Sequence, residues 1–200
     1  MNLKTLWQPS SNDHAPLLIL LHGYGSRAED LHALAPYFPQ LNVLTLEAPL
    51  QVGPNSYAWY LLQEPRLIAP TDALNTAAIA IHETALAYQI KAKSQSMHLL
   101  GFSQGGVLAQ YVAFQNPALY QSIAVLSSFW PTNQNIPPIP GQKIFWAHGA
   151  KDSVIPLSIA EQHRLALERQ GAIVEAHTYA MGHTVCEEEL QNLIRFLKKL

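Results

Sequence analysis

The stretch Gly101-Phe102-Ser103-Gln104-Gly105 has the spacing G-x-S-x-G. An apolar run at residues 97–100 precedes it, and a run with helical spacing at residues 104–115 follows it. A strand that leads through a tight turn into a helix is the context in which this motif holds a serine at the tip of the turn. The two glycines leave room for the backbone to fold back on itself. We therefore expect Ser103 to lie in a strained conformation above the end of a sheet.

Patterns typical of strands and helices alternate on both sides of this motif. Short apolar runs predict strands at residues 17–21, 43–46, 97–100, 123–126, 143–148 and 173–179, with an edge strand at residues 3–7. Other segments predict helices at residues 30–38, 71–93 (capped by Asp72), 104–115, 156–170 and 186–200. Such alternation is typical of a mostly parallel sheet with helices on both faces. We expect residues 1–200 to form a single α/β domain, without a separate lid domain.

The composition excludes several classes of partner. Charged residues make up 13% of the 200 residues and the net charge is −2, so no strong field would attract nucleic acid or an anionic membrane. The amino terminus has no long apolar run, which predicts no signal peptide, and the longest apolar stretch, residues 16–21, is too short for stable membrane insertion. The single cysteine, Cys186, excludes a disulfide within the chain. We expect a cytoplasmic protein; the oligomeric state is not indicated.

Four loops that are rich in glycine or polar residues come directly after predicted strands. They are residues 22–26, residues 101–105, residues 148–152 and the segment after residue 179. Ligands of open parallel sheets bind outside the carboxyl ends of the strands. The four loops are therefore expected to meet at one site.

A serine hydroxyl needs an adjacent base to act as a nucleophile at neutral pH, and histidine is the natural base. Of the nine histidines, His183 follows the last predicted strand, whereas His22 and His148 precede glycines in tight turns that explain them better. Among the four aspartates, Asp152 alone follows a late strand and lies between the serine and the histidine. The order Ser103, Asp152, His183 is that of the catalytic triad in α/β-hydrolases. Asp152 could instead cap a helix or turn, and His183 could be an ordinary loop histidine.

Together the four loops resemble the signature blocks of the phospholipase/carboxylesterase family, which includes acyl-protein thioesterases and small bacterial carboxylesterases. The matching segments are residues 22–25, 101–106, 148–156 and 179–183, and they occur in the family's order over nearly the whole chain. The resemblance implies the α/β-hydrolase fold. It also implies that Ser103 is the nucleophile, Asp152 the orienting acid and His183 the base. The backbone N–H groups of Tyr24 and Gln104 would form the oxyanion hole.

Two positions depart from the family pattern. Ser26 replaces the aspartate that many members carry after H-G-x-G, and Phe129-Trp130 is bulkier than the pair that thioesterase-like members often show. The second departure argues against a long acyl channel. Two proline-rich segments, residues 51–70 and 127–141, are expected to form irregular loops on the rim of the site. Their aromatic residues Trp59, Tyr60, Phe129 and Trp130 are candidates for lining a short apolar pocket. Trp59 is equally compatible with a packing role.

These observations predict a serine hydrolase that cleaves carboxylic esters of short to medium acyl chains through an acyl-enzyme. Its substrate would be a small-molecule ester or thioester, and the mechanism needs neither a metal nor an organic cofactor. The alternatives within this class are an acyl-protein thioesterase and a lysophospholipase. A noncatalytic binding protein of the same fold is the alternative from another class, although it would have no structural reason to keep the triad. Cys186, three residues after His183, is interpreted as a packed small hydrophobe rather than a nucleophile or redox switch.

Overall fold

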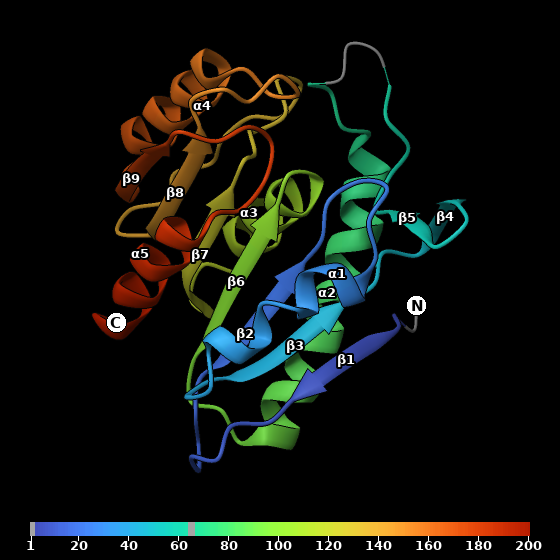
Figure 1. The fold of residues 1–200 in the computed structure, drawn as a ribbon, viewed down its shortest axis with the longest axis vertical. Helices are drawn as coiled ribbons and strands as arrows, with labels where there is room; N and C mark the ends of the chain where they lie inside the picture. The colour runs from blue at the N-terminus through green and yellow to red at the C-terminus, as the bar shows by residue number, and fades with distance from the viewer. Residues whose placement is uncertain (1–2, 64–66) are drawn as a thin grey trace.

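The computed structural model describes residues 3–63 and 67–200, and a seven-stranded sheet forms its centre (Figure 1). The strand order is β1-β3-β2-β6-β7-β8-β9. β1 pairs antiparallel with β3, and the five remaining neighbouring pairs are parallel. The strands are β1 (Thr5–Gln8), β2 (Leu17–Leu21), β3 (Asn42–Leu46), β6 (Met97–Phe102), β7 (Tyr120–Leu126), β8 (Lys143–Gly149) and β9 (Ile173–Tyr179).

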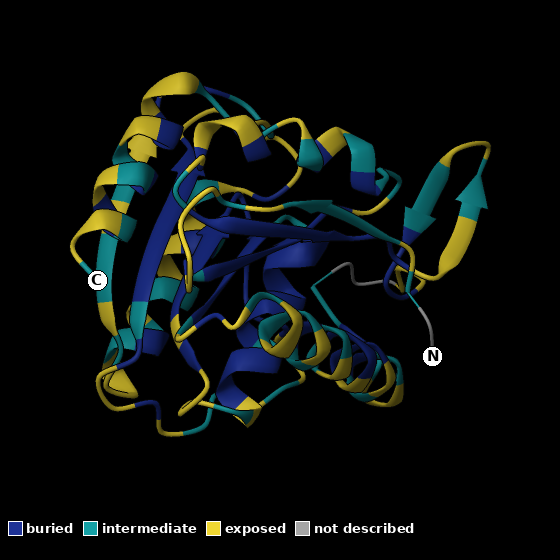
Figure 2. Ribbon diagram, turned by 90° about the horizontal axis from the view of Figure 1, so that it is seen from below, coloured by how far each residue is buried: buried dark blue, intermediate teal, exposed yellow. Residues whose placement is uncertain are grey.

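Helices cover both faces of the sheet, and each face has its own hydrophobic core. Successive strand side chains point to opposite faces. Accordingly, Ile19 packs in the cluster that includes residues of α2 (Thr71–Ala92), α3 (Gln104–Gln115) and α4 (Leu157–Arg169). Leu18 packs in the cluster that includes residues of α1 (Ala28–His32) and α5 (Glu187–Lys198). All five residues of β2 are buried, which explains its continuous apolar run. Figure 2 shows the buried strands between helices whose outer faces are exposed. A short 3₁₀ turn, η1 (Ala35–Tyr37), follows α1.

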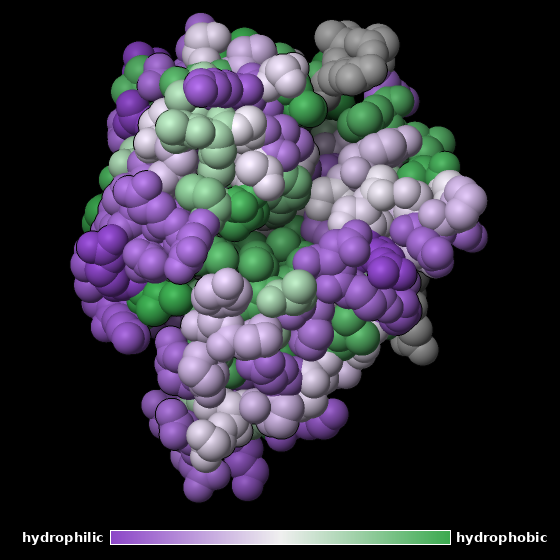
Figure 3. Space-filling view, viewed as in Figure 1, coloured by the Kyte–Doolittle hydropathy of each residue, from purple (hydrophilic) through white to green (hydrophobic). Residues whose placement is uncertain are grey.

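The surface is mostly polar. In the space-filling view, hydrophilic residues cover much of the molecule, and hydrophobic residues reach the surface near the centre of this face, close to where β6 ends in Figure 1 (Figure 3). Among the helices of residues 3–63 and 67–200, none combines the length and the apolar character that a membrane span requires.

The structure corrects three local expectations. The loop predicted at residues 51–70 begins instead as a hairpin of β4 (Leu50–Gly53) and β5 (Ser56–Ala58), and residues 64–66 of that prediction lie outside the described residues. Pro54 falls in its turn, where a fixed φ and a missing N–H are tolerated, and Asn55 adopts a φ of 54°. Asp72 does not cap α2, since Pro70 occupies the N-cap and no side chain bonds there. The helix expected at residues 30–38 is instead the short α1 followed by η1.

Candidate active site

Ser103 lies in the turn between β6 and α3, with a φ of 53° and a ψ of −118°. A non-glycine residue with positive φ is strained, and surrounding contacts must hold it in place. The Ser103 N–H donates a hydrogen bond to the Leu126 carbonyl at 2.9 Å, and the Ser128 hydroxyl donates to the Ser103 carbonyl at 2.6 Å. A Cβ at Gly105 would lie 1.9 Å from the Leu21 carbonyl oxygen. Only glycine therefore lets α3 start against the end of β2.

The side chains of Ser103, His183 and Asp152 form a chain of hydrogen bonds. His183 Nε2 lies 3.0 Å from Ser103 Oγ, and His183 Nδ1 lies 2.7 Å from Asp152 Oδ2. A carboxylate beside Nδ1 favours the proton on that nitrogen, which leaves Nε2 to accept the serine proton. The Asp152 side chain is fully buried, whereas that of His183 is 17% exposed. The structure thus brings together the three side chains that the sequence analysis selected.

Asp152 owes its charge to its hydrogen bonds. Its Oδ1 accepts hydrogen bonds from the N–H groups of Val154 and Ile155, both at 2.9 Å. Burial raises the pKa of Asp152, but the hydrogen bonds from Ile155, His183 and Val154 outweigh burial and hold this pKa below its ordinary value. The carboxylate is therefore ionised at neutral pH. Asp152 caps its own turn with one oxygen and offers the other to the histidine, so its two candidate roles are compatible.

Close backbone contact brings the loops after β8 and β9 together. The Lys151 N–H donates to the Met181 carbonyl at 2.9 Å. A Cβ at Gly149 would lie 2.3 Å from the Gly182 carbonyl oxygen, so a side chain there would push the two loops apart. This contact places the acid beside the histidine.

The residues predicted to form the oxyanion hole, Tyr24 and Gln104, line the same cavity as Ser103. Gln104 is the first residue of α3, and the first N–H groups of a helix have no partner within it. Within the hydrogen bonds of residues 3–63 and 67–200, neither the Tyr24 nor the Gln104 backbone N–H has an acceptor. Both amides are available to bind an anionic oxygen.

A cavity of about 640 Å³ adjoins Ser103. Two of the four predicted pocket residues, Tyr60 and Phe129, contribute to its wall. An apolar wall with a few convergent polar groups is typical of small-molecule sites. The sequence analysis did not name Leu62, Leu67, Val154 or Ile155, because which apolar residue of a loop faces a cavity depends on contacts distant in sequence. The described lining consists of Tyr24, Tyr60, Leu62, Leu67, Ser103, Gln104, Phe129, Val154, Ile155 and His183.

The other two predicted pocket residues, Trp59 and Trp130, are absent from the described lining of this cavity. Trp59 is 2% exposed, and its indole N–H donates to the His22 carbonyl at 2.9 Å. Trp130 is 4% exposed, its indole N–H donates to the Gln134 carbonyl at 2.8 Å, and its ring centroid lies 5.2 Å from that of Phe114. Both rings pack inward, so the alternative packing role applies to Trp59, and the pocket role predicted for both residues is corrected.

His148 supports the acid, a role that the sequence analysis did not assign. Its Nε2–H donates to the Ile155 carbonyl at 2.8 Å and lies 3.4 Å from Asp152 Oδ2. Burial lowers the pKa of His148, so the ring is neutral and its contact with Asp152 is not an ion pair. The sequence did contain a signal for this role, namely a polar side chain at the end of a buried strand. Such a side chain must form its hydrogen bonds inside the protein.

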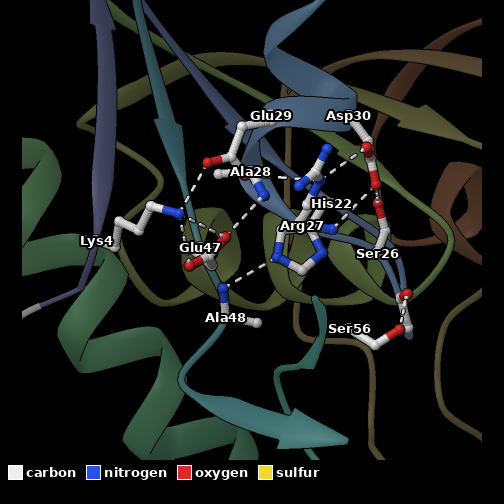
Figure 4. A network of polar contacts seen from close by, with 11 residues as sticks. Lys4, His22, Ser26, Arg27, Ala28, Glu29, Asp30, Glu47, Ala48 and Ser56 are labelled. Atoms are coloured by element: carbon white, nitrogen blue, oxygen red, sulfur yellow. Dashed lines mark hydrogen bonds and ion pairs between the residues drawn. The ribbon is translucent and has the colours of Figure 1, made fainter. Parts of the chain in front are cut away.

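His22 supports the loop after β2 in the same way. Its Nδ1–H donates to the Gly23 carbonyl at 2.8 Å, and its Nε2 accepts from the Ala48 N–H at 3.0 Å. Burial lowers the pKa of His22, which keeps Nε2 unprotonated for this bond. Next to it, Glu47 accepts from Lys4 Nζ at 3.2 Å (Figure 4). The segment that follows β3 therefore supports the loop that carries Tyr24, through the bond between Ala48 and His22.

Comparisons with known proteins identify the family of the chain. The model of the Phospholipase/Carboxylesterase family matches residues 5–200. Acyl-protein thioesterase 1 of Mycosarcoma maydis is 32% identical over 120 residues, which are 55% of this chain and 50% of that protein. A probable carboxylesterase of Oryza sativa subsp. japonica is 26% identical over 204 residues, which are 90% of this chain and 86% of that protein.

Among solved structures, esterase PE8 superimposes with a TM-score of 0.90 at 25% identity, over 100% of this chain and 99% of that chain. The match thus spans about half the length of the thioesterase, most of the rice protein and nearly all of the esterase. The family match extends over the central sheet and all four loops of the site. The chain therefore belongs to the phospholipase/carboxylesterase family and is an α/β-hydrolase of the carboxylesterase type.

Proposed function

We propose that the protein is a serine hydrolase that cleaves small carboxylic esters with short to medium acyl chains. Ser103 is the nucleophile, His183 the general base and Asp152 the acid that orients the base. The observation that carries the proposal is the chain of hydrogen bonds from the buried Asp152 carboxylate through His183 to the Ser103 hydroxyl, at 2.7 Å and 3.0 Å. A noncatalytic binding protein would gain nothing from this arrangement. A cytoplasmic location stays a prediction from the sequence.

The reaction has two halves. Ser103 Oγ attacks the substrate carbonyl carbon while its proton passes to His183 Nε2, and Asp152 stabilises the imidazolium that forms. The Tyr24 and Gln104 N–H groups hold the developing oxyanion, and each donor lowers the barrier by roughly 3 kcal/mol. The bond to the leaving group then breaks, and His183 returns the proton to the departing alcohol or thiol. Water, deprotonated by His183, attacks the acyl-enzyme and releases the acid.

The cavity wall supports the limit on acyl length. Each buried methylene contributes about 0.8 kcal/mol while there is room for it, and crowding then destabilises by a similar amount or more. Phe129 is 6% exposed and Tyr60 is 1% exposed, so neighbouring residues hold both rings in the wall. We therefore expect kcat/KM to rise over short acyl chains and to fall for long ones.

A panel of p-nitrophenyl esters from acetyl to palmitoyl tests this proposal, with a thioester panel in parallel because one relative is named an acyl-protein thioesterase. Wild-type protein should prefer short to medium chains, and Ser103→Ala should lose several orders of magnitude in rate while staying folded. A fluorophosphonate should label Ser103 alone. Labelling of another residue would overturn the assignment of the nucleophile. A wild-type optimum at palmitoyl esters would favour a protein deacylase or a lysophospholipase.

Two aromatic neighbours provide a matched test of the pocket wall. Phe129 lines the cavity, whereas Trp130 packs against Phe114. Phe129→Ala should therefore move the optimum to longer chains, and Trp130→Ala should leave the optimum in place, when both proteins are assayed at a temperature where they are folded. A shift of the optimum acyl length in the Trp130→Ala protein would indicate that the Trp130 ring lines the pocket after all.

A further inference from the structure

The two amides of the proposed oxyanion hole come from different parts of the fold. Tyr24 belongs to the loop after β2, and Gln104 opens α3. An oxyanion hole works only if both donors reach one oxygen at 2.7 to 3.1 Å, so small changes in their separation weaken it. The contacts that fix this separation therefore affect catalysis without touching the substrate.

One residue makes hydrogen bonds to both segments. The Trp59 indole N–H donates to the carbonyl of His22, two residues before Tyr24, at 2.9 Å. The Trp59 backbone N–H donates to Gln104 Oε1 at 2.9 Å, and Gln104 Nε2 in turn donates to the Tyr60 carbonyl at 2.8 Å. The Gln104 carboxamide thus bonds to the backbone of two consecutive residues, accepting from Trp59 and donating to Tyr60.

These bonds are shielded from water. Trp59 is 2% exposed and Gln104 is 3% exposed. A buried donor or acceptor that loses its partner cannot bond to solvent instead, so the geometry is strongly held.

The His22 carbonyl is also where the two segments touch. A Cβ at Gly105 would lie 2.7 Å from that oxygen, so the start of α3 presses against it. The indole of Trp59 bonds to the same oxygen, and its ring centroid lies 5.6 Å from that of His22. The backbone before Tyr24 is therefore held between α3 and the indole.

We propose that Trp59 is a positioning residue that sets the separation of the Tyr24 and Gln104 amides, with the Gln104 carboxamide as its partner. The inference rests on the proposed function, because it concerns the oxyanion hole of that reaction. Trp59 does not line the cavity, and it acts through His22 and Gln104. Because the hole binds the transition state more strongly than the substrate, loss of this support should lower kcat and leave KM nearly unchanged.

Trp59→Phe tests the inference, since it removes the indole N–H and keeps an aromatic ring. Trp130→Phe is the matched control, because Trp130 is also a buried residue, 4% exposed, and its indole N–H donates to the Gln134 carbonyl, away from the hole. We expect kcat to fall about 10-fold to 100-fold in Trp59→Phe, with KM within about twofold of wild type. Trp130→Phe should keep kcat within about twofold of wild type, because its bond lies outside the hole. The affinity for a trifluoromethyl ketone, which forms a tetrahedral adduct with an active serine, should fall in parallel with kcat/KM in Trp59→Phe only.

A second variant changes Gln104, the residue that bonds to Trp59. Gln104→Met keeps the length of the side chain and removes both of its hydrogen bonds, so it tests the inference even if Trp59→Phe fails to fold. In the double variant, which combines Trp59→Phe with Gln104→Met, the fold-loss in kcat should be smaller than the product of the two single fold-losses, because the two groups support the same geometry. An unchanged kcat in both single variants, an equal loss in Trp130→Phe, or a rise in KM alone would overturn the inference. Wild-type protein that neither hydrolyses esters nor is labelled at Ser103 would instead overturn the proposed function.

Discussion

Two buried carboxylates near the histidine loop differ in their charge. Asp152 is 7% exposed and Glu189, near the start of α5, is 0% exposed. The pKa of Asp152 nevertheless lies below its ordinary value, while burial raises the pKa of Glu189 to about 7. Burial alone would raise both.

The number of hydrogen-bond donors explains the difference. Asp152 accepts two backbone N–H groups and the His183 imidazole. Glu189 accepts one N–H, from Cys186 at 3.3 Å, and its Oε1 has no partner among the described residues. Of these two acids, only Asp152 has several donors directed toward it, and only its pKa is lowered. The backbone N–H groups of the loop after β8 therefore keep the Asp152 carboxyl group ionised.

The largest expected effect tests the charged member of the pair. Asp152→Asn keeps the volume but removes the charge that fixes the His183 tautomer, so kcat should fall on the order of 10³-fold to 10⁴-fold. Ester hydrolysis at pH 8 measures the loss, and circular dichroism checks that the fold is kept. A loss of less than about tenfold would show that the charge of this acid is not essential to the reaction.

Glu189→Gln tests the other member. The folded state holds the Glu189 proton up to pH values near 7, whereas the unfolded chain releases it near the ordinary value of 4.5. The free energy of unfolding of the wild type therefore falls as the pH rises between these values. The variant has no carboxyl group to titrate at this position. Its free energy of unfolding relative to that of the wild type should therefore rise by about 2 to 3 kcal/mol between pH 5 and pH 8. Urea unfolding at the two pH values measures it, and a constant difference would mean that Glu189 does not titrate on folding.

His148 provides a smaller test of how the acid's loop is held. His148→Leu removes the donor to the Ile155 carbonyl, a bond worth about 1 kcal/mol, so kcat should fall about 3-fold to 10-fold through a looser Asp152. His148→Gln can place an N–H near the same position and should recover most of the rate. Because burial keeps the His148 ring neutral, neither variant should change the pH dependence of kcat/KM. Equal losses in both variants would indicate a packing role only.

The smallest expected effect concerns Cys186, whose backbone N–H is the described donor to Glu189. Cys186→Ser keeps that N–H and places a preferred residue at the N-cap of α5, so stability should change by less than about 1 kcal/mol. Activity should stay within about twofold, because a packed thiol takes no part in the reaction. A loss of more than about tenfold in a folded protein would reopen the role of the thiol as nucleophile or redox switch.

The sequence predicted the parts of the molecule that local patterns determine. Apolar runs such as residues 17–21 indicate buried strands, and the loops at Ser103, Asp152 and His183 follow from where such strands end. The inward packing of Trp130 was not predicted, and that of Trp59 was one of two alternatives, because the direction of a loop side chain depends on contacts far away in sequence. The hairpin of β4 and β5 was not predicted either, because the three prolines in residues 51–70 favoured the interpretation of this segment as an irregular loop.

The φ of 53° at Ser103 has a consequence for protein engineering. Such a conformation stores on the order of 1 to 3 kcal/mol in a residue with a side chain, and a glycine would relieve it. Ser103→Gly would remove the strain and the hydroxyl together. If Ser103 is the nucleophile, as proposed, we expect a library screened for heat resistance alone to be enriched in inactive proteins. Directed evolution of this chain has to select for turnover in every round, because the two properties oppose each other at this position.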